Sequence, residues 1–385
     1  MSFDKLTEYL DSLQDTYGMP VGDLMVMKDH EEVYRHSFGY ADYDKQVPVS
    51  ANNLYRLYSA TKVITMTAIL QLIEQGKLKF HDRVSDYLPE YDKVFVKSRL
   101  PENKDVTHIA HNDMRIIDLM TMSAGFSYDL FDPALQEKIK ETNDKGSTRE
   151  MIEALSRVPL LFEPGTEWNY SLSHDVAAAV LEVVTGMSFG EYLKKYIFEP
   201  LGANDFYFQR HIDKATHDRI CAIYTADNDR PPFYGISDEK ADEFTFTQNY
   251  ESGGAGLIGS VDSYILVVDA LACGGVGKTG KRILKPETVE LFTHPYTTFG
   301  QLKKDFDSLN RIGYEYGLGV RVLVDGTKSK SPVGEFGWDG AAGAYALVDT
   351  KNKISVFYAE HVTCFGDNYH VIHPKIRDLI YEGLE

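Results

Sequence analysis

A serine and a lysine three residues apart could together carry out nucleophilic catalysis. Ser59 and Lys62 open the segment SATKVITMTAILQLIEQG, whose apolar residues predict a helix. Side chains three apart lie on one face of a helix, so the hydroxyl and the amine can reach each other. If Ser59 is the first helical residue, its N–H is an unpaired donor at the positive end of the helix dipole. This Ser-x-x-Lys motif would then supply a nucleophile, a candidate base and half of an oxyanion hole.

The same spacing recurs at Ser237 and Lys240, so the motif alone proves little. That second pair lies in an acidic stretch with no apolar helix after it, which indicates a solvated surface segment. Lys62 instead lies on an apolar helix, where loss of solvation makes an amine a better candidate for a base. The alternative for the first pair is a helix-capping serine beside a lysine that reaches out to solvent.

Two further segments could supply what a serine–lysine pair lacks. Tyr170 follows the turn in FEPGTEWNYSL, and a phenol beside a lysine can carry a proton to a leaving group. A packed aromatic side chain is the alternative. The segment GWDGAAG, residues 337–343, enters a predicted strand, so its small residues would let a substrate approach a backbone N–H of an oxyanion hole. A glycine-rich turn or bulge is the alternative there.

Other motifs do not predict a nucleotide or metal site. The segment ACGGVGKT (272–279) resembles a phosphate-binding loop, but such a loop must lead directly into a helix, and a new helix is predicted only from Pro286. Histidine pairs at helical spacing have no evident third ligand, so no metal and no cofactor is expected. These pairs are His108 with His111, and His370 with His373.

The predicted elements change in type along the chain. The segment MSFDKLTEYLDSLQDTYG predicts an amphipathic helix with Leu6, Leu10 and Leu13 on one face, and two strands follow it. From Tyr314 onward the pattern is again of strands, and the chain ends in a helix. The part between is mostly helical. An α+β fold follows, with an antiparallel sheet built from both termini, flanked by helices, and a mostly helical domain inserted in it.

This pattern gives a domain division and places the site. Residues 1–55 and 262–385 are expected to form the discontinuous sheet domain, residues 56–261 the helical domain, and the active site is expected at their junction.

Composition bounds the class of protein. The chain has 385 residues, 43% of them hydrophobic, as in ordinary globular proteins. A formal net charge of −18 argues against nucleic-acid partners. No apolar run approaches the roughly 18 residues of a membrane span, and the start has no basic and apolar leader, so no membrane partner and a cytoplasmic location are expected. Three separated cysteines indicate buried reduced thiols.

The assembled segments resemble the serine β-lactamase-like superfamily, which includes penicillin-binding proteins, class C-type β-lactamases, D-aminopeptidases and β-lactamase-fold carboxylesterases. The resemblance covers nearly the whole chain and implies the β-lactamase/transpeptidase-like fold. It is carried by four segments in the family's order: YRLYSATKVITMTAILQLIEQGKLKFHDRVSDYLPEY, MRIIDLMTMSAGFSYD, FEPGTEWNYSLSHDVAAAVLEVVTG and GGAGLIGSVDSYILVVDALACGG.

The resemblance also implies roles for single residues. Ser59 would be the acylated nucleophile, Lys62 its base partner, and Tyr170 the proton carrier of the family's Tyr-x-Asn element. The N–H groups of Ser59 and Ala341 would form the oxyanion hole. Residues 338–340, Trp-Asp-Gly, would be the third element, usually Lys-Thr-Gly or His-x-Gly, so the literal Lys-Thr-Gly at 278–280 would be a decoy.

Two departures from the family pattern shift the expected substrate. Leu172 stands where an asparagine normally binds the amide of a β-lactam or peptide, and Trp338 replaces a group that would face a substrate carboxylate. Both changes are familiar in the carboxylesterase and acyltransferase branch. Asp339 is less expected, and its carboxylate would lie near the cleft or face solvent in a turn. The substrate-binding residues would be Leu172, Trp338, Asp339 and Gly340.

The sequence therefore predicts a serine hydrolase that cleaves small-molecule carboxylic esters through a Ser59 acyl-enzyme, with acyl transfer as a further outcome. Lys62 and Tyr170 would share the roles of general base and acid. The alternatives are a β-lactamase or D-amino-acid peptidase related to penicillin-binding proteins, and a non-catalytic scaffold with the same fold. No oligomeric state follows from the sequence.

Overall fold

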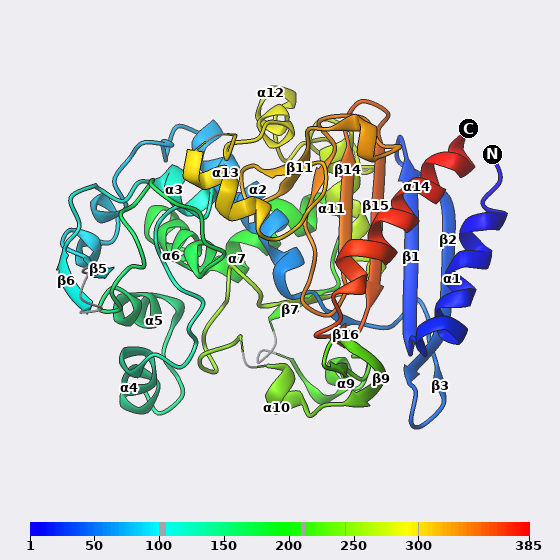
Figure 1. Cartoon of the computed structure of the whole chain (residues 1–385), viewed down its shortest axis with the longest axis horizontal. Coiled ribbons are helices and arrows are strands. Elements are labelled where there is room, and N and C mark those ends of the chain that lie inside the picture. The colour runs from blue at the N-terminus through cyan, green and yellow to red at the C-terminus, as the bar shows by residue number, and fades with distance from the viewer. Residues whose placement is uncertain (100–104, 209–211, 243, 299) are drawn as a thin grey trace.

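An eight-stranded antiparallel sheet joins the two ends of the chain in the computed structural model, which describes residues 1–99, 105–208, 212–242, 244–298 and 300–385 (Figure 1). The strand order is β11-β12-β13-β14-β15-β1-β2-β3. The central neighbours β1 and β15 pair with Gly22 opposite Glu360 and Lys28 opposite Ile354. The strands are β1 (Val21–Lys28), β2 (Glu31–Asp42), β3 (Val47–Pro48), β11 (Tyr314–Tyr316), β12 (Arg321–Leu323), β13 (Phe336–Gly337), β14 (Tyr345–Asp349) and β15 (Ile354–Glu360). The predicted sheet from both termini is confirmed.

Helices cover both faces of this sheet. The helices α1 (Asp4–Tyr17) and α14 (His373–Leu384) lie on one face, and α11 (Val261–Ala272) lies on the other (Figure 1). Successive side chains of β1 point to opposite faces of the sheet. Leu24 and Val26 therefore pack with α1 and α14, while Met25 and Met27 belong to the core on the side of α11. The predicted amphipathic helix is also confirmed, since Leu6, Leu10 and Leu13 of α1 are all fully buried.

The helical part of the molecule packs around α2 (Thr61–Glu74). Every residue of α2 from Thr61 to Leu72 is buried, which a helix that is apolar on all sides requires. It contacts α6 (Ser173–Thr185), which ends at Gly186 in the left-handed conformation, with a φ of 69°. Around them lie α3 (Ile116–Met120), α4 (Pro133–Glu141), α5 (Thr148–Leu155), α7 (Phe189–Leu193) and α8 (Glu199–Leu201).

Left-handed glycines end α1, α6 and α8. Their φ angles are 71° at Gly18, 69° at Gly186 and 72° at Gly202. A side chain disfavours this left-handed conformation, which explains why glycine stands at these helix ends. Further helices are α9 (Lys214–His217), α10 (Asp238–Ala241), α12 (Pro286–Glu290) and α13 (Gly300–Asp307).

Three smaller sheets complete the fold. They are β4 (Tyr55–Arg56) with β10 (Leu257–Gly259) and β7 (Phe206–Phe208); β16 (Val362–Thr363) with β8 (Tyr224–Asp227) and β9 (Arg230–Gly235); and β5 (Phe95–Arg99) with β6 (Asp105–Ile109). Strands therefore occur inside the segment 56–261, and α12 and α13 lie inside 262–385. The sheet and helix content agrees with the expected fold class, while the domain boundaries stay a prediction.

One helix pair meets the length and apolarity expected of a membrane span. No single helix in the described ranges does so alone. The pair is Ser173–Thr185 with Phe189–Leu201, which bends by 75° between its two parts.

Candidate active site

Ser59 lies in a short 3-10 turn, η1 (Tyr58–Ala60), directly before α2. Tyr58 has a φ of 45°, an uncommon conformation for a residue with a side chain. Two buried phenols hold the turn in place, because Tyr58 donates to the Ala241 carbonyl at 2.8 Å and Tyr264 donates to the Ala60 carbonyl at 2.7 Å. The turn thus presents the Ser59 hydroxyl, 8% exposed, at the start of the apolar helix.

Lys62 is fully buried and faces Ser59. Its Nζ donates to Ser59 Oγ at 3.1 Å and to the Gly254 carbonyl at 2.7 Å. Gly254 has to be a glycine, since a Cβ there would lie 2.5 Å from Asp175 Oδ2 and 3.5 Å from Lys62 Nζ. The structure therefore brings the predicted pair into contact and excludes a lysine that reaches out to solvent.

Aromatic rings cover the Lys62 ammonium on one side. Its Nζ lies 4.6 Å from the ring centre of Tyr170 and 5.6 Å from that of Tyr128, distances at which a cation is attracted to a ring. The Tyr170 ring stacks between Tyr128 and Trp338, with ring centres 5.6 Å apart on each side. Trp338 Nε1 also donates to the Tyr170 hydroxyl at 3.0 Å. The structure thus brings together four residues from four separate segments.

Tyr128 is a site residue that the sequence analysis missed. Burial raises the pKa of its phenol well above the ordinary range, which a hydrogen-bonding contact with Ser59 only partly offsets. The residue does lie in MRIIDLMTMSAGFSYD, one of the segments that carry the family resemblance. Its role could not be predicted, because nothing local in that segment indicates which ring faces the nucleophile.

A buried carboxylate lies behind the lysine. Asp175, fully buried, accepts hydrogen bonds from the hydroxyls of Tyr250 at 2.7 Å and Ser252 at 2.6 Å. Its other oxygen borders Gly254, as Lys62 does. The neighbouring His174 is fully buried, and burial together with the Lys62 charge lowers its pKa well below the ordinary value. A buried imidazole and a buried carboxyl group therefore lie close to Lys62.

The turn that carries Ala341 packs against the backbone leading to Ser59. A Cβ on Gly340 would lie 2.4 Å from the Leu57 carbonyl oxygen, so only glycine allows this approach. The Gly340 N–H donates to the Ala344 carbonyl at 2.8 Å, and Tyr369 donates to the Gly340 carbonyl at 3.0 Å. The turn predicted to hold the second oxyanion donor is thus fixed beside the first. The oxyanion role of Ala341 stays a prediction.

Asp339 does not face solvent in a turn but is buried in an ion-pair network, and its assignment as a substrate-binding residue stays a prediction. Its carboxylate is 4% exposed and forms an ion pair with Arg321 Nη1 at 2.9 Å. Arg311 Nη2 lies 2.8 Å from the other oxygen, without hydrogen-bond geometry, and His373 Nδ1 lies 3.6 Å away. The two guanidinium groups hold the pKa of Asp339 well below its usual range despite its burial. The carboxylate thus neutralises the buried Arg321 and the partly buried Arg311.

The remaining sequence motifs lie outside this cluster. Leu172 is 3% exposed and precedes α6, where its side chain joins the main core. Thr279 of the Lys-Thr-Gly triplet donates to the Pro200 carbonyl at 2.7 Å in an exposed turn, and α12 begins afresh at Pro286. Ser237 caps the short helix α10. The triplet thus lies apart from the Ser59 cluster, and no helix directly follows the segment 272–279, which the structure describes in full.

The structure combines an antiparallel sheet, a set of helices, and a cluster of a serine, a lysine and a tyrosine. This combination defines the serine β-lactamase-like class, whose members include hydrolases and acyl-transferring enzymes. The family model described as Beta-lactamase matches residues 6–363, so the chain belongs to that family.

Relatives within the family carry different activities in their names. Esterase EstB of Burkholderia gladioli is 28% identical over 383 residues, covering 94% of this chain and 91% of that protein. A protein of Escherichia coli strain K12 named "Putative D-alanyl-D-alanine carboxypeptidase" is 28% identical over 378 residues, covering 90% and 79%. Among solved structures, EstCE1, a hydrolase with promiscuous acyltransferase activity, matches with a TM-score of 0.77 at 24% identity over 98% of both chains. That last likeness shows the fold.

Proposed function

We propose that this protein cleaves carboxylic esters through an acyl-enzyme on Ser59. The Ser59 oxygen attacks the ester carbonyl carbon, and its proton passes to the Lys62–Tyr170 pair. The N–H groups of Ser59 and Ala341 stabilise the oxyanion of the tetrahedral intermediate. The intermediate collapses with loss of the alkoxide, which takes a proton from the same pair and leaves as the alcohol. Water then attacks the acyl-enzyme and releases the acid, or a second alcohol takes the acyl group.

The buried Trp338 is the observation that most favours an ester over a lactam or peptide substrate. Its indole is 4% exposed, stacks on Tyr170 and donates to the phenol oxygen. Family members that bind a substrate carboxylate have a cationic or imidazole group at this element, and the indole offers an apolar face instead. The nearby guanidinium of Arg321 is 3% exposed and already paired with Asp339. A neutral ester therefore fits this wall better than an anionic lactam or peptide.

The hydrogen bond from Trp338 also favours a proton-transfer role for Tyr170. The indole occupies one acceptor position on the phenol oxygen at 3.0 Å, so the hydroxyl proton has to point elsewhere. Lys62 lies against the same ring and contacts Ser59. A proton can then move between serine, lysine and phenol without leaving this buried cluster. Trp338 acts here as a positioning residue for Tyr170.

A comparison of ester and lactam hydrolysis tests the proposal. The purified chain is assayed with p-nitrophenyl acetate, butyrate and octanoate, and in parallel with a chromogenic cephalosporin. We expect ester hydrolysis with a higher kcat/KM than cephalosporin hydrolysis, and a loss of about 10³-fold or more in Ser59→Ala. Ser237→Ala, the serine of the second Ser-x-x-Lys sequence, is the matched control and should keep wild-type activity.

Two results would overturn the proposal in different ways. Faster turnover of the cephalosporin than of any ester would show a β-lactamase or peptidase that uses the same nucleophile. Wild-type ester hydrolysis by Ser59→Ala would show that the nucleophile itself is wrong.

A further inference from the structure

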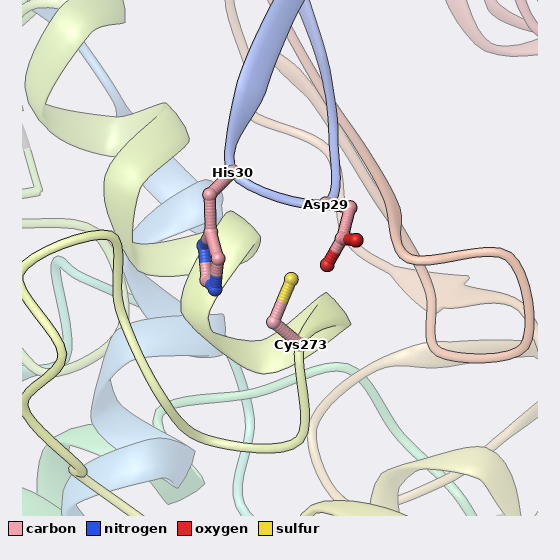
Figure 2. A group of neighbouring side chains, drawn as sticks. All are labelled: Asp29, His30 and Cys273. Atoms are coloured by element: carbon pink, nitrogen blue, oxygen red, sulfur yellow. The ribbon is translucent and has the colours of Figure 1, made fainter.

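A second group of chemically reactive side chains lies away from Ser59, between the β1–β2 hairpin and the end of α11 (Figure 2). Asp29 and His30 form the turn of the hairpin, and Cys273 directly follows α11. One carboxylate oxygen, one ring nitrogen and the thiol sulfur all lie within 4.8 Å of one another. Figure 2 shows the two hairpin side chains pointing toward the cysteine, which points back toward them. Three metal-binding atom types thus converge on one point.

The backbone at this turn is unusual for its residues. Asp29 has a φ of 49° and His30 a φ of 70°, both in the left-handed region. Two-residue hairpins of this kind favour Asn-Gly or Asp-Gly, because glycine carries no side chain to strain. A histidine at the second position therefore costs conformational energy that a glycine would not. The turn thus contains a histidine at a position where local backbone propensity favours glycine.

A buried carboxylate orients the imidazole. His30 Nδ1 lies 2.7 Å from Asp269 Oδ2, and the Asp269 side chain has no exposed surface. This bond assigns the ring proton to Nδ1 and leaves the lone pair of Nε2 free. Metal-binding histidines commonly have this carboxylate behind the ring, because it fixes the tautomer and makes the ligand nitrogen more basic. The bond joins residues 239 positions apart in the sequence, so no sequence motif could reveal it.

The cluster is poorly suited to thiol catalysis. Cys273 lies beside the carboxylates of Asp29 and Asp269, and its Sγ is 3.9 Å from Asp269 Oδ1. A reactive cysteine needs the opposite environment, one that stabilises the thiolate. The same carboxylates attract a cation, and a bound cation would displace the thiol proton.

We propose that Asp29, His30 and Cys273 bind one Zn²⁺, with water as the fourth ligand. A set of one sulfur, one imidazole nitrogen and one carboxylate oxygen suits this borderline-soft cation. Binding forms a zinc–thiolate bond and releases the Cys273 proton to solvent, with no change of redox state. Ligand atoms of a tetrahedral zinc lie about 3.5 Å apart, so the 4.8 Å limit requires a closure of about 1.3 Å at most.

The most exposed ligand can make that adjustment. The Asp29 side chain is 59% exposed, and its present partner is Lys353, whose Nζ lies 2.8 Å from Oδ1. The Lys353 ammonium is 52% exposed and can turn to solvent when a cation replaces it. His30, at 26% side-chain exposure, and the fixed Asp269 need not move. The bound ion would fasten the hairpin to the end of α11.

A second histidine-containing cluster provides a built-in comparison. His108, His111 and Glu163 also lie within 4.8 Å of one another. Glu163 Oε1 already bonds both imidazoles, at 2.9 and 3.0 Å, and its other oxygen accepts the His111 and Asn112 N–H groups. The polar atoms of this cluster therefore already hydrogen-bond to one another, and the cluster contains no cysteine. A variant at His111 therefore tests whether bound metal comes from this place.

Cobalt titration of the full-length, chelator-stripped chain tests the proposal, because Co²⁺ replaces Zn²⁺ and reports its ligands by absorption. We expect one equivalent of Co²⁺, with a sulfur-to-cobalt charge-transfer band that one equivalent of Zn²⁺ abolishes. Cys273→Ser should lose the band, and Asp269→Asn should weaken Zn²⁺ binding by about 10- to 100-fold. The exposed Cys364→Ser and His111→Ala variants should bind as the wild type does.

His30→Asn keeps the test valid if other variants fold poorly, since asparagine tolerates the left-handed turn and a circular dichroism spectrum checks the fold. We expect it to weaken Co²⁺ binding by at least about 10-fold. Less than one-tenth of an equivalent bound to the wild type would overturn the proposal. Binding without the charge-transfer band, or binding lost in His111→Ala and kept in Cys273→Ser, would also overturn it.

Discussion

Replacing Asp339 by asparagine should destabilise the whole protein, although the residue follows Trp338 in the candidate site. The substitution keeps the shape of the side chain and an oxygen for Arg321 Nη1, which now lies 2.9 Å from Oδ1. It removes the negative charge that balances Arg321, 3% exposed, and Arg311, whose side chain is 14% exposed. Removing one partner of a buried ion pair costs about 3–5 kcal/mol, and we expect the lower end because the hydrogen bond can remain.

Urea unfolding of the wild type and of Asp339→Asn measures this loss, and its pH dependence checks the cause. The folded-state pKa of Asp339 is lowered, so its charge contributes stability in full above the unfolded pKa of about 3.9 and loses it as the pH falls toward the folded value. The difference between the two proteins should therefore be constant from pH 8 to pH 5 and shrink below about pH 4. Asp378→Asn is the control.

Asp378 accepts from Arg377 Nε at 2.8 Å, but its side chain is 33% exposed, so its loss should cost about 1 kcal/mol or less. Enzyme kinetics separate the two roles considered for Asp339. A residue that only supports the turn should change the unfolding free energy, whereas a substrate contact should raise KM at unchanged stability. A higher KM with an unfolding free energy within about 0.5 kcal/mol of the wild type would refute the structural role.

Three further substitutions give distinct outcomes. Trp338→Phe keeps the ring but removes the N–H donor to Tyr170, so kcat/KM for an ester should fall about 2- to 10-fold; an unchanged value would show that the bond does not matter. Burial raises the pKa of Glu182 to about 7. Glu182→Gln should therefore gain about 3 kcal/mol of stability at pH 8, and the gain should vanish as the pH falls to about 4.5; a constant gain would contradict this cause. Gly254→Ala should lower stability by about 1–3 kcal/mol, because the new Cβ would lie 2.5 Å from Asp175 Oδ2, and a neutral effect in urea unfolding would argue against that contact.

Much of the fold and the main site residues could be predicted from local patterns. Leu6, Leu10 and Leu13 revealed a helix by their spacing, and the family's segment order carried the sheet and the inserted helices. Ser59 and Lys62 could be paired because a helix fixes the reach of residues three apart. Tyr170 and Trp338 entered through the family pattern, and their contact at 3.0 Å joins them in space.

The features that the sequence could not predict share one cause, which is contact between segments that lie far apart in the chain. Asp339 is surrounded by polar and small residues in sequence, and only the fold brings Arg311 and Arg321 to it. Strands β5 and β6 pair with Phe95 opposite Ile109, a hairpin that the sequence did not predict, while residues 100–104 lie outside the described ranges. Of the three thiols expected to be buried, Cys364 is exposed, and Cys273 lies beside His30.

Covalent labelling during turnover tests most directly whether Ser59 is the nucleophile. The protein is mixed with a p-nitrophenyl ester, quenched with acid after a few turnovers, and digested for peptide mass mapping. The account predicts an acyl group on the peptide that contains Ser59, at the serine hydroxyl, and no adduct in Ser59→Ala. An acyl group on another residue, or the same adduct yield in Ser59→Ala, would contradict it.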